Sequence, residues 1–90
     1  MDIKSEEIDD KSKRGVLSSL RTKIDSIEDI QDLIFSLESV KEELFAITGG
    51  HKVLFEISSQ IKLLKEETLS DPIRADLKKR TVFWIKKIEN

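Results

Sequence analysis

His51 is the first side chain to consider for chemistry, because it is the only histidine of this chain and cysteine is absent. Without thiolates, a metal ion bound by His51 would need carboxylate ligands. The nearest carboxylate on its C-terminal side, Glu56, is five residues away and off the same helical face. A solvent-exposed histidine at the start of a helix therefore explains His51 better than a metal ligand does, and we expect no metal site.

Acidic pairs and a glycine-containing turn are the other motifs that could act in catalysis or phosphate binding. Glu42-Glu43 and Glu66-Glu67 are sequence neighbours that point in different directions on a helix, so they fit solvated faces better than a paired acid and base. Residues 48–52 lack the spacing of a P-loop, and no strand precedes them. No histidine is placed to activate a serine. We therefore expect no enzyme activity, no catalytic residue and no cofactor.

Length and composition restrict the class of protein further. Ninety residues form one domain, and a single core of this size is marginal unless the helices pack well or a partner adds buried area. The lack of cysteine excludes a disulfide framework and fits a reducing compartment. No apolar run approaches the roughly 18 residues of a membrane span, and the charged start lacks the apolar segment of a signal peptide. These features predict a soluble intracellular protein of the cytoplasm or nucleus.

Charge alternates in blocks along the chain. Residues 1–10 and 25–50 are acidic, whereas residues 11–24 and 70–90 are basic. The simplest interpretation is internal pairing, in which an acidic helix lies beside a basic one, although exposed pairs contribute only about 0–1 kcal/mol each. A functional basic patch is the alternative interpretation. The net charge of −2 argues against a general nucleic-acid binder.

Helix-breaking residues divide the chain into the elements that must position these side chains. The strongest breakers are the pair Gly49-Gly50 and residues 70–72, which include the only proline. Glycine favours the left-handed conformation that closes a helix, and proline fits the first turn of one. Between the breakers, apolar residues recur every three or four positions, as expected for amphipathic helices.

The N-terminal part is predicted to contain a tail and one short helix. Residues 1–12 are acidic and poor in large apolar side chains, so we expect a flexible tail that precedes a single domain over residues 13–90. The apolar set that begins at Val16 is out of phase with the set that begins at Ile27. We therefore expect a break near Asp25, with Asp25 or the following serine as the N-cap of the next helix.

Three further helices are expected, over residues 27–48, over residues 51–67, and from about residue 70 to the C-terminal end. Short connections between long amphipathic helices favour antiparallel neighbours. The predicted fold is therefore all-α: an antiparallel up-down helical bundle with three long helices and a shorter N-terminal helix. The last helix is expected to bury Ile73, Leu77, Trp84 and Ile88.

Each of the three long predicted helices carries one phenylalanine outside its apolar stripe. Phe35 projects among acidic and polar residues, Phe55 projects beside a serine and a lysine, and Phe83 has lysines around it. Three explanations compete: cover by the N-terminal helix, an interface with another protein or a second copy, and stacking of nucleic-acid bases on Phe83. The candidate partner-binding residues are Phe35, Phe55, Leu63, Val82, Phe83, Lys79, Lys86 and Lys87.

Two stretches resemble known families of small helical proteins. Residues 45–49, followed by Lys52 and later by Trp84 and Lys86, resemble the leucine–tryptophan domains of transcription elongation factors, which bind short disordered segments of other transcription proteins. Residues 56–62 are similar to part of the bacteriocin immunity proteins, four-helix bundles that act through partners at a membrane. Both resemblances imply a helical bundle that works by binding, and neither is adopted as an assignment.

The sequence therefore predicts a protein-interaction module: a small helical adaptor, regulatory subunit or inhibitor that presents a helical face to another protein or to a second copy in a homodimer. The alternative is a regulator associated with nucleic acid through the basic segment 11–23 and the basic C-terminal helix. Salt dependence separates the two, because phosphate contacts release counterions and weaken steeply as salt rises.

Overall fold

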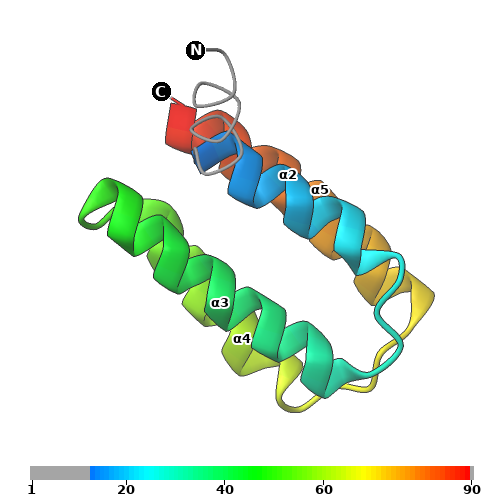
Figure 1. The fold of residues 1–90 in the computed structure, drawn as a ribbon. Helices are drawn as coiled ribbons and strands as arrows, with labels where there is room; N and C mark the ends of the chain where they lie inside the picture. Colours follow the sequence, from blue (N-terminus) through cyan, green and yellow to red (C-terminus); the bar gives the residue numbers. More distant parts are fainter. Residues whose placement is uncertain (1–12, 90) are drawn as a thin grey trace.

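The computed structural model describes residues 13–89, which fold into four helices joined by short connections (Figure 1). The helices are α2 (Lys13–Ile24), α3 (Ile30–Thr48), α4 (Lys52–Leu64) and α5 (Asp71–Glu89). The predicted all-α class is confirmed. The tail predicted over residues 1–12 lies outside the described residues, as does residue 90.

Consecutive helices run in opposite directions and form two layers (Figure 1). Helices α2 and α5 lie side by side in one layer, and α3 and α4 lie side by side in the other. Between the layers, α2 approaches α3 and α4 approaches α5, whereas within residues 13–89 no Cα atom of α3 lies within 8 Å of one in α5, and none of α2 within 8 Å of one in α4. The order around the bundle is therefore the order of the chain, and α3 lies diagonally opposite α5.

The helix lengths differ from the expected three long helices and a shorter N-terminal one. Helices α3 and α5 have 19 residues each, but α4 has 13 and α2 has 12. Helix α4 ends at Leu64, where the backbone tightens: the N–H groups of Glu66 and Glu67 donate to carbonyls three residues earlier. None of the four helices in the described range combines the length and the apolar composition needed to cross a membrane.

The break between the first two helices is confirmed, but its capping residue differs from the prediction. Helix α3 has Asp29 as its N-cap, and the side chain of Asp29 accepts a hydrogen bond from the N–H of Gln31 at 3.1 Å. Neither Asp25 nor Ser26 caps the helix. Ser26 Oγ instead donates to the carbonyl of Lys23 at 3.0 Å, while Asp25 is held by the last helix of the chain. Helix α3 therefore begins at residue 30 and not at residue 27.

The glycine pair ends α3 as predicted. Gly49 has a φ of 75°, and its N–H donates to the carbonyl of Phe45 at 2.7 Å. His51 then begins the next helix as the N-cap, because its ring Nδ1 accepts a hydrogen bond from the N–H of Val53 at 3.1 Å. The imidazole therefore has a structural role at the helix start, and it is half-buried where full exposure was expected.

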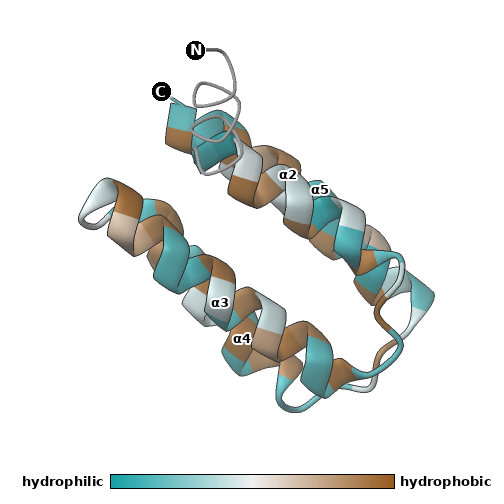
Figure 2. Cartoon of the chain, viewed as in Figure 1, coloured by the Kyte–Doolittle hydropathy of each residue, from teal (hydrophilic) through white to brown (hydrophobic). Residues whose placement is uncertain are grey.

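Apolar residues from all four helices meet in one core, and the brown positions in Figure 2 lie on every helix. Trp84 is the largest fully buried side chain, with 1% of its surface exposed. Leu77 and Ile88 are buried as predicted. Ile73 is only half-buried, and Thr81 occupies a core position that the sequence analysis did not predict. The hydroxyl of Thr81 is satisfied in the core because it donates a hydrogen bond to the carbonyl of Leu77 at 2.7 Å.

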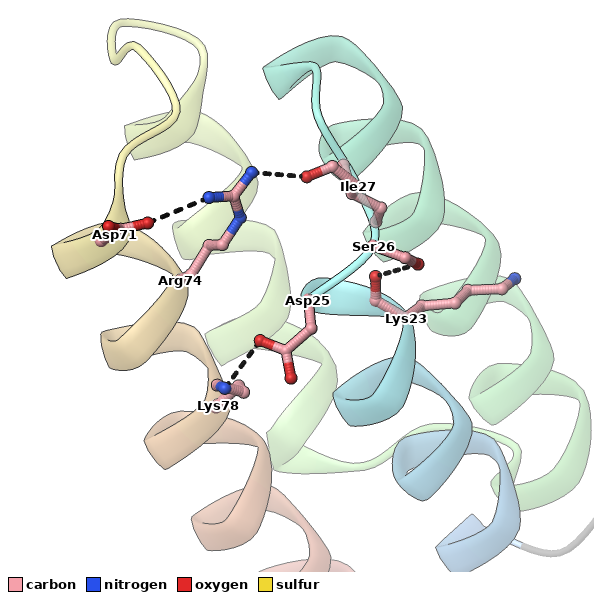
Figure 3. A network of polar contacts seen from close by, with 7 residues as sticks. All are labelled: Lys23, Asp25, Ser26, Ile27, Asp71, Arg74 and Lys78. Atoms are coloured by element: carbon pink, nitrogen blue, oxygen red, sulfur yellow. Dashed lines mark hydrogen bonds and ion pairs between the residues drawn. The ribbon is translucent and has the colours of Figure 1, made fainter.

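A polar network fastens the connection between α2 and α3 to the first turns of α5 (Figure 3). Arg74 donates through Nη2 to the carbonyl of Ile27 at 2.8 Å and through Nη1 to Asp71 at 3.1 Å. Lys78, one turn further along α5, binds the carboxylate of Asp25 at 2.7 Å. The hydrogen bond from Lys78 holds the pKa of Asp25 below its ordinary value.

Candidate protein-interaction surface

All the phenylalanines of this chain lie on the outside of the bundle. Phe35, Phe45, Phe55 and Phe83 have 70%, 59%, 79% and 61% of their surface exposed. Helix α2 packs on α3 and α5 and leaves these rings uncovered. It therefore does not provide the cover that the first of the three explanations requires.

The outer side of α5 gathers four of the eight predicted binding residues. Lys79, Val82, Phe83 and Lys86 recur at helical spacing and line one shallow hollow. Arg21 reaches the same hollow from α2, because α2 lies beside α5. From the sequence, Arg21 is identified only as part of the basic segment 11–23 and not as a neighbour of Phe83, since no pattern within one helix shows which other helix will pack against it. We call these five residues the basic–aromatic face.

The cations of the basic–aromatic face have no ion-pair partner among residues 13–89. Lys78, which lines the same hollow, is instead bound to Asp25 at 2.7 Å. Within this part of the chain, positive charge that has no ion-pair partner therefore lies around Phe83.

Lys87 lies apart from this face, although the sequence groups it with Lys79 and Lys86. Its ammonium group binds Glu56 on α4, and the other carboxylate oxygen of Glu56 accepts a hydrogen bond from Trp84 Nε1 at 3.2 Å. The hydrogen bond from Lys87 holds the pKa of Glu56 below its ordinary value. Lys87 thus links α5 to α4 over the edge of the core.

The two predicted binding residues of α4 lie on other surfaces. Phe55 lies on the exposed side of α4. Leu63 lines a separate hollow between α4 and α5, together with Pro72 and Ile73. The structure therefore distributes the predicted residues over several surfaces and does not gather them into one site.

A second exposed face lies on α3, and only one of its residues, Phe35, is among the predicted binding residues. Phe35, Glu38, Glu42 and Phe45 are all exposed and recur at spacings of three and four residues. We call these residues the acidic–aromatic face. Neither glutamate has an ion-pair partner among residues 13–89. The signal that identifies Phe35, a ring outside the apolar stripe, applies equally to Phe45.

No family model, curated protein or solved structure matches this chain. Neither of the two resemblances in the sequence therefore establishes a family for this chain. Within the described range, no group of three or more histidine, cysteine, aspartate or glutamate side chains is arranged to hold a metal ion.

The charges of the helices explain why these faces have opposite sign. Helix α2 has four basic residues and no acidic one, and α5 has six basic and three acidic residues. On α3, four acidic residues outnumber a single lysine. The predicted pairing of acidic with basic helices is limited, because no salt bridge within residues 13–89 joins α2 to α3. Much of the charge therefore stays on the outer surface.

Proposed function

We propose that this chain is a protein-interaction module that uses its basic–aromatic face to hold an acidic segment of another polypeptide. One observation carries the proposal: Phe83, with 61% of its surface exposed, lies in a hollow beside cations that have no ion-pair partner within residues 13–89. An adaptor, a regulatory subunit and an inhibitor would all use such a face in the same way.

The ring and the cations have separate roles in this proposal. A phenylalanine ring serves as an anchor, because aromatic side chains bury a large apolar area and often dominate the free energy of binding. The lysines and Arg21 attract acidic side chains and orient them, with more effect on specificity and association rate than on affinity. The expected ligand is therefore a short segment that has an apolar anchor flanked by aspartate or glutamate.

Nucleic acid is the second candidate ligand, because α2 and α5 lie side by side and combine two basic helices in one layer. A ring beside lysines also suits the stacking of bases. The number of cations in the hollow favours a protein ligand over nucleic acid. The hollow offers three cations without an ion-pair partner in the described range, Arg21, Lys79 and Lys86, whereas strongly salt-dependent DNA binders make about 6–10 phosphate contacts.

Fluorescence anisotropy with a labelled acidic peptide that contains one phenylalanine anchor tests the proposal. We expect the wild-type chain to bind this peptide and Phe83→Ala to bind it at least about tenfold more weakly, as at an interface hot spot. The matched control is Phe55→Ala, which removes an exposed ring from a different helix and should bind as the wild type does.

A single-stranded oligonucleotide of similar length provides the competing outcome. Peptide binding should weaken modestly between about 50 and 200 mM salt, whereas binding through many phosphates would weaken by orders of magnitude. Binding of the oligonucleotide without binding of the peptide would contradict the proposal. Equal losses of peptide affinity in the two alanine variants would contradict it as well.

A further inference from the structure

We infer that the acidic segment held by the basic–aromatic face belongs to a second copy of this chain, which presents the acidic–aromatic face of its α3. This inference rests on the proposed function and names its partner. Both faces expose phenylalanine, but one combines it with lysines and the other with glutamates. The two faces therefore complement each other in charge while sharing an apolar anchor.

The two faces are also compatible in length. Phe35 and Phe45 are ten residues apart on α3, which corresponds to about 15 Å along the helix. Lys79 and Lys86 are seven residues apart on α5, about 10 Å. Both lysines of one copy therefore fall within the length of the acidic–aromatic face of the next, whose glutamates lie between its two rings.

Unpaired charges on both faces favour contact between unlike faces. Glu38 and Glu42 have no salt bridge among residues 13–89, and the same is true of Lys79 and Lys86. Contact between α3 of one copy and α5 of another would give these groups partners. Contact between two α3 helices or two α5 helices would bring like charges together, which disfavours a symmetric interface.

The position of the two faces in the bundle sets the kind of assembly. Helices α3 and α5 lie diagonally opposite each other, with no Cα atoms within 8 Å in the described range, and the side chains of both faces are exposed. A closed two-fold dimer could pair both faces at once only if they lay on the same side of the molecule. Each copy therefore binds two neighbours, one through each face, and the expected assembly is an open head-to-tail chain or a ring.

Charge reversal of one face at a time tests the inference by sedimentation velocity over a wide range of protein concentration. We expect the wild type to form concentration-dependent species larger than a dimer. The variants Lys79→Glu/Lys86→Glu and Glu38→Lys/Glu42→Lys should each remain monomeric, because the two faces of each variant then have the same sign. An equimolar mixture of the two variants should assemble again, because each supplies the face that the other needs.

Two controls separate an effect on the interface from a change in fold or net charge. Lys62→Glu/Lys65→Glu changes the net charge by the same amount as Lys79→Glu/Lys86→Glu, but at exposed lysines outside both faces. This variant should assemble as the wild type does. All variants should keep the wild-type helicity and melting behaviour by circular dichroism. The milder variant Lys79→Gln/Lys86→Gln, which neutralises the face without reversing it, should shift assembly to higher protein concentration.

The outcomes separate this inference from the proposed function. A wild-type chain that stays monomeric at every concentration yet binds the acidic peptide through Phe83 overturns the self-association and leaves the proposed function standing. A chain that neither self-associates nor binds the peptide overturns both. Assembly of either charge-reversed variant alone, or no recovery in the mixture, also overturns the inference.

Discussion

Phe83 and Trp84 are neighbours in the sequence and have opposite roles in the structure. Trp84 is 1% exposed, and its Nε1–H group donates to Glu56, whereas Phe83 is 61% exposed on the basic–aromatic face. One residue along a helix corresponds to a rotation of about 100°, which is enough to move a side chain from the core to the outside. The two rings should therefore respond differently to truncation.

Alanine substitution at each ring tests these roles at the residue scale. Trp84→Ala should lower the free energy of unfolding by about 3–5 kcal/mol, because it leaves a large cavity in the core. Phe83→Ala should change it by less than about 0.5 kcal/mol, as expected for an exposed side chain. Urea denaturation at low protein concentration, followed by circular dichroism, measures both values. A loss of several kcal/mol in Phe83→Ala would mean that the ring is buried in the monomer.

At the scale of elements, the connection between α2 and α3 is held by side chains of α5 (Figure 3). Arg74 donates to the carbonyl of Ile27 and to Asp71, while its buried Nε atom has no hydrogen-bond partner within residues 13–89. An unsatisfied buried N–H group destabilises the fold, so this loss offsets part of the stabilisation that the bonds of the other two nitrogens contribute. Helix α5 thus fixes the backbone of the connection between α2 and α3, although the two segments are distant in the sequence.

Replacing Arg74 by methionine, which keeps a similar side-chain length and removes all donors, tests this role. We expect the free energy of unfolding to fall by about 1–3 kcal/mol, because the carbonyl of Ile27 loses its partner. The matched control is Arg80→Met, which removes a surface pair with Asp76 on the same helix and should lower stability by only about 0.3–0.5 kcal/mol. If chemical denaturation showed equal losses of stability in the two variants, the hydrogen bond from Arg74 to the carbonyl of Ile27 would stabilise the fold no more than a surface ion pair does.

At the scale of the whole molecule, two carboxylates attach other parts of the bundle to α5. Asp25, in the connection after α2, binds Lys78, and Glu56 of α4 binds Lys87. The hydrogen bond from the lysine is the main cause of the lowered pKa in both carboxyl groups. A carboxyl group whose pKa is lower in the folded state stabilises the fold above the unfolded-state pKa, and this stabilisation is lost as the pH falls.

The free energy of unfolding should therefore decrease as the pH is lowered below about 4, near the ordinary pKa values of aspartate and glutamate. The double variant Asp25→Asn/Glu56→Gln should show a shallower decrease, because it lacks both groups. Denaturant titrations at a series of pH values measure the slope. Glu66→Gln/Glu67→Gln removes the same number of carboxyl groups outside these pairs and serves as the control. An unchanged slope in the Asp25 and Glu56 variant would contradict the assigned role.

Local signals in the sequence were sufficient to locate the helices and most of the core. Gly49 ends α3 because glycine readily adopts a positive φ, and Pro72 fits the first turn of α5 because its missing N–H is not needed there. Burial of Leu77, Trp84 and Ile88 followed from spacings of seven and four residues, since such residues share one side of a helix. These features depend on interactions within one helix or one turn.

The choice of N-cap for α3 shows where local signals end. Asp25, Ser26 and Asp29 are all residue types that cap helices, so sequence alone offers no basis for choosing among them. The carboxylate of Asp25 is occupied by Lys78 of α5, and Asp29 caps the helix. The start of α3 therefore coincides with a contact between Asp25 and Lys78, which are distant in the sequence.

The composition of the exposed faces likewise depends on how the helices pack. Helical periodicity places Phe83 on the outside of α5, but the packing of α2 against α5 brings Arg21 into the same hollow. Lys87 does not belong to the basic–aromatic face, because its ammonium group binds Glu56 of α4. Periodicity is a property of one helix, whereas the neighbours of a helix depend on the summed contacts of the whole core. The approximate positions of the helices therefore followed from local sequence signals, while the surfaces that the helices form together depended on tertiary packing.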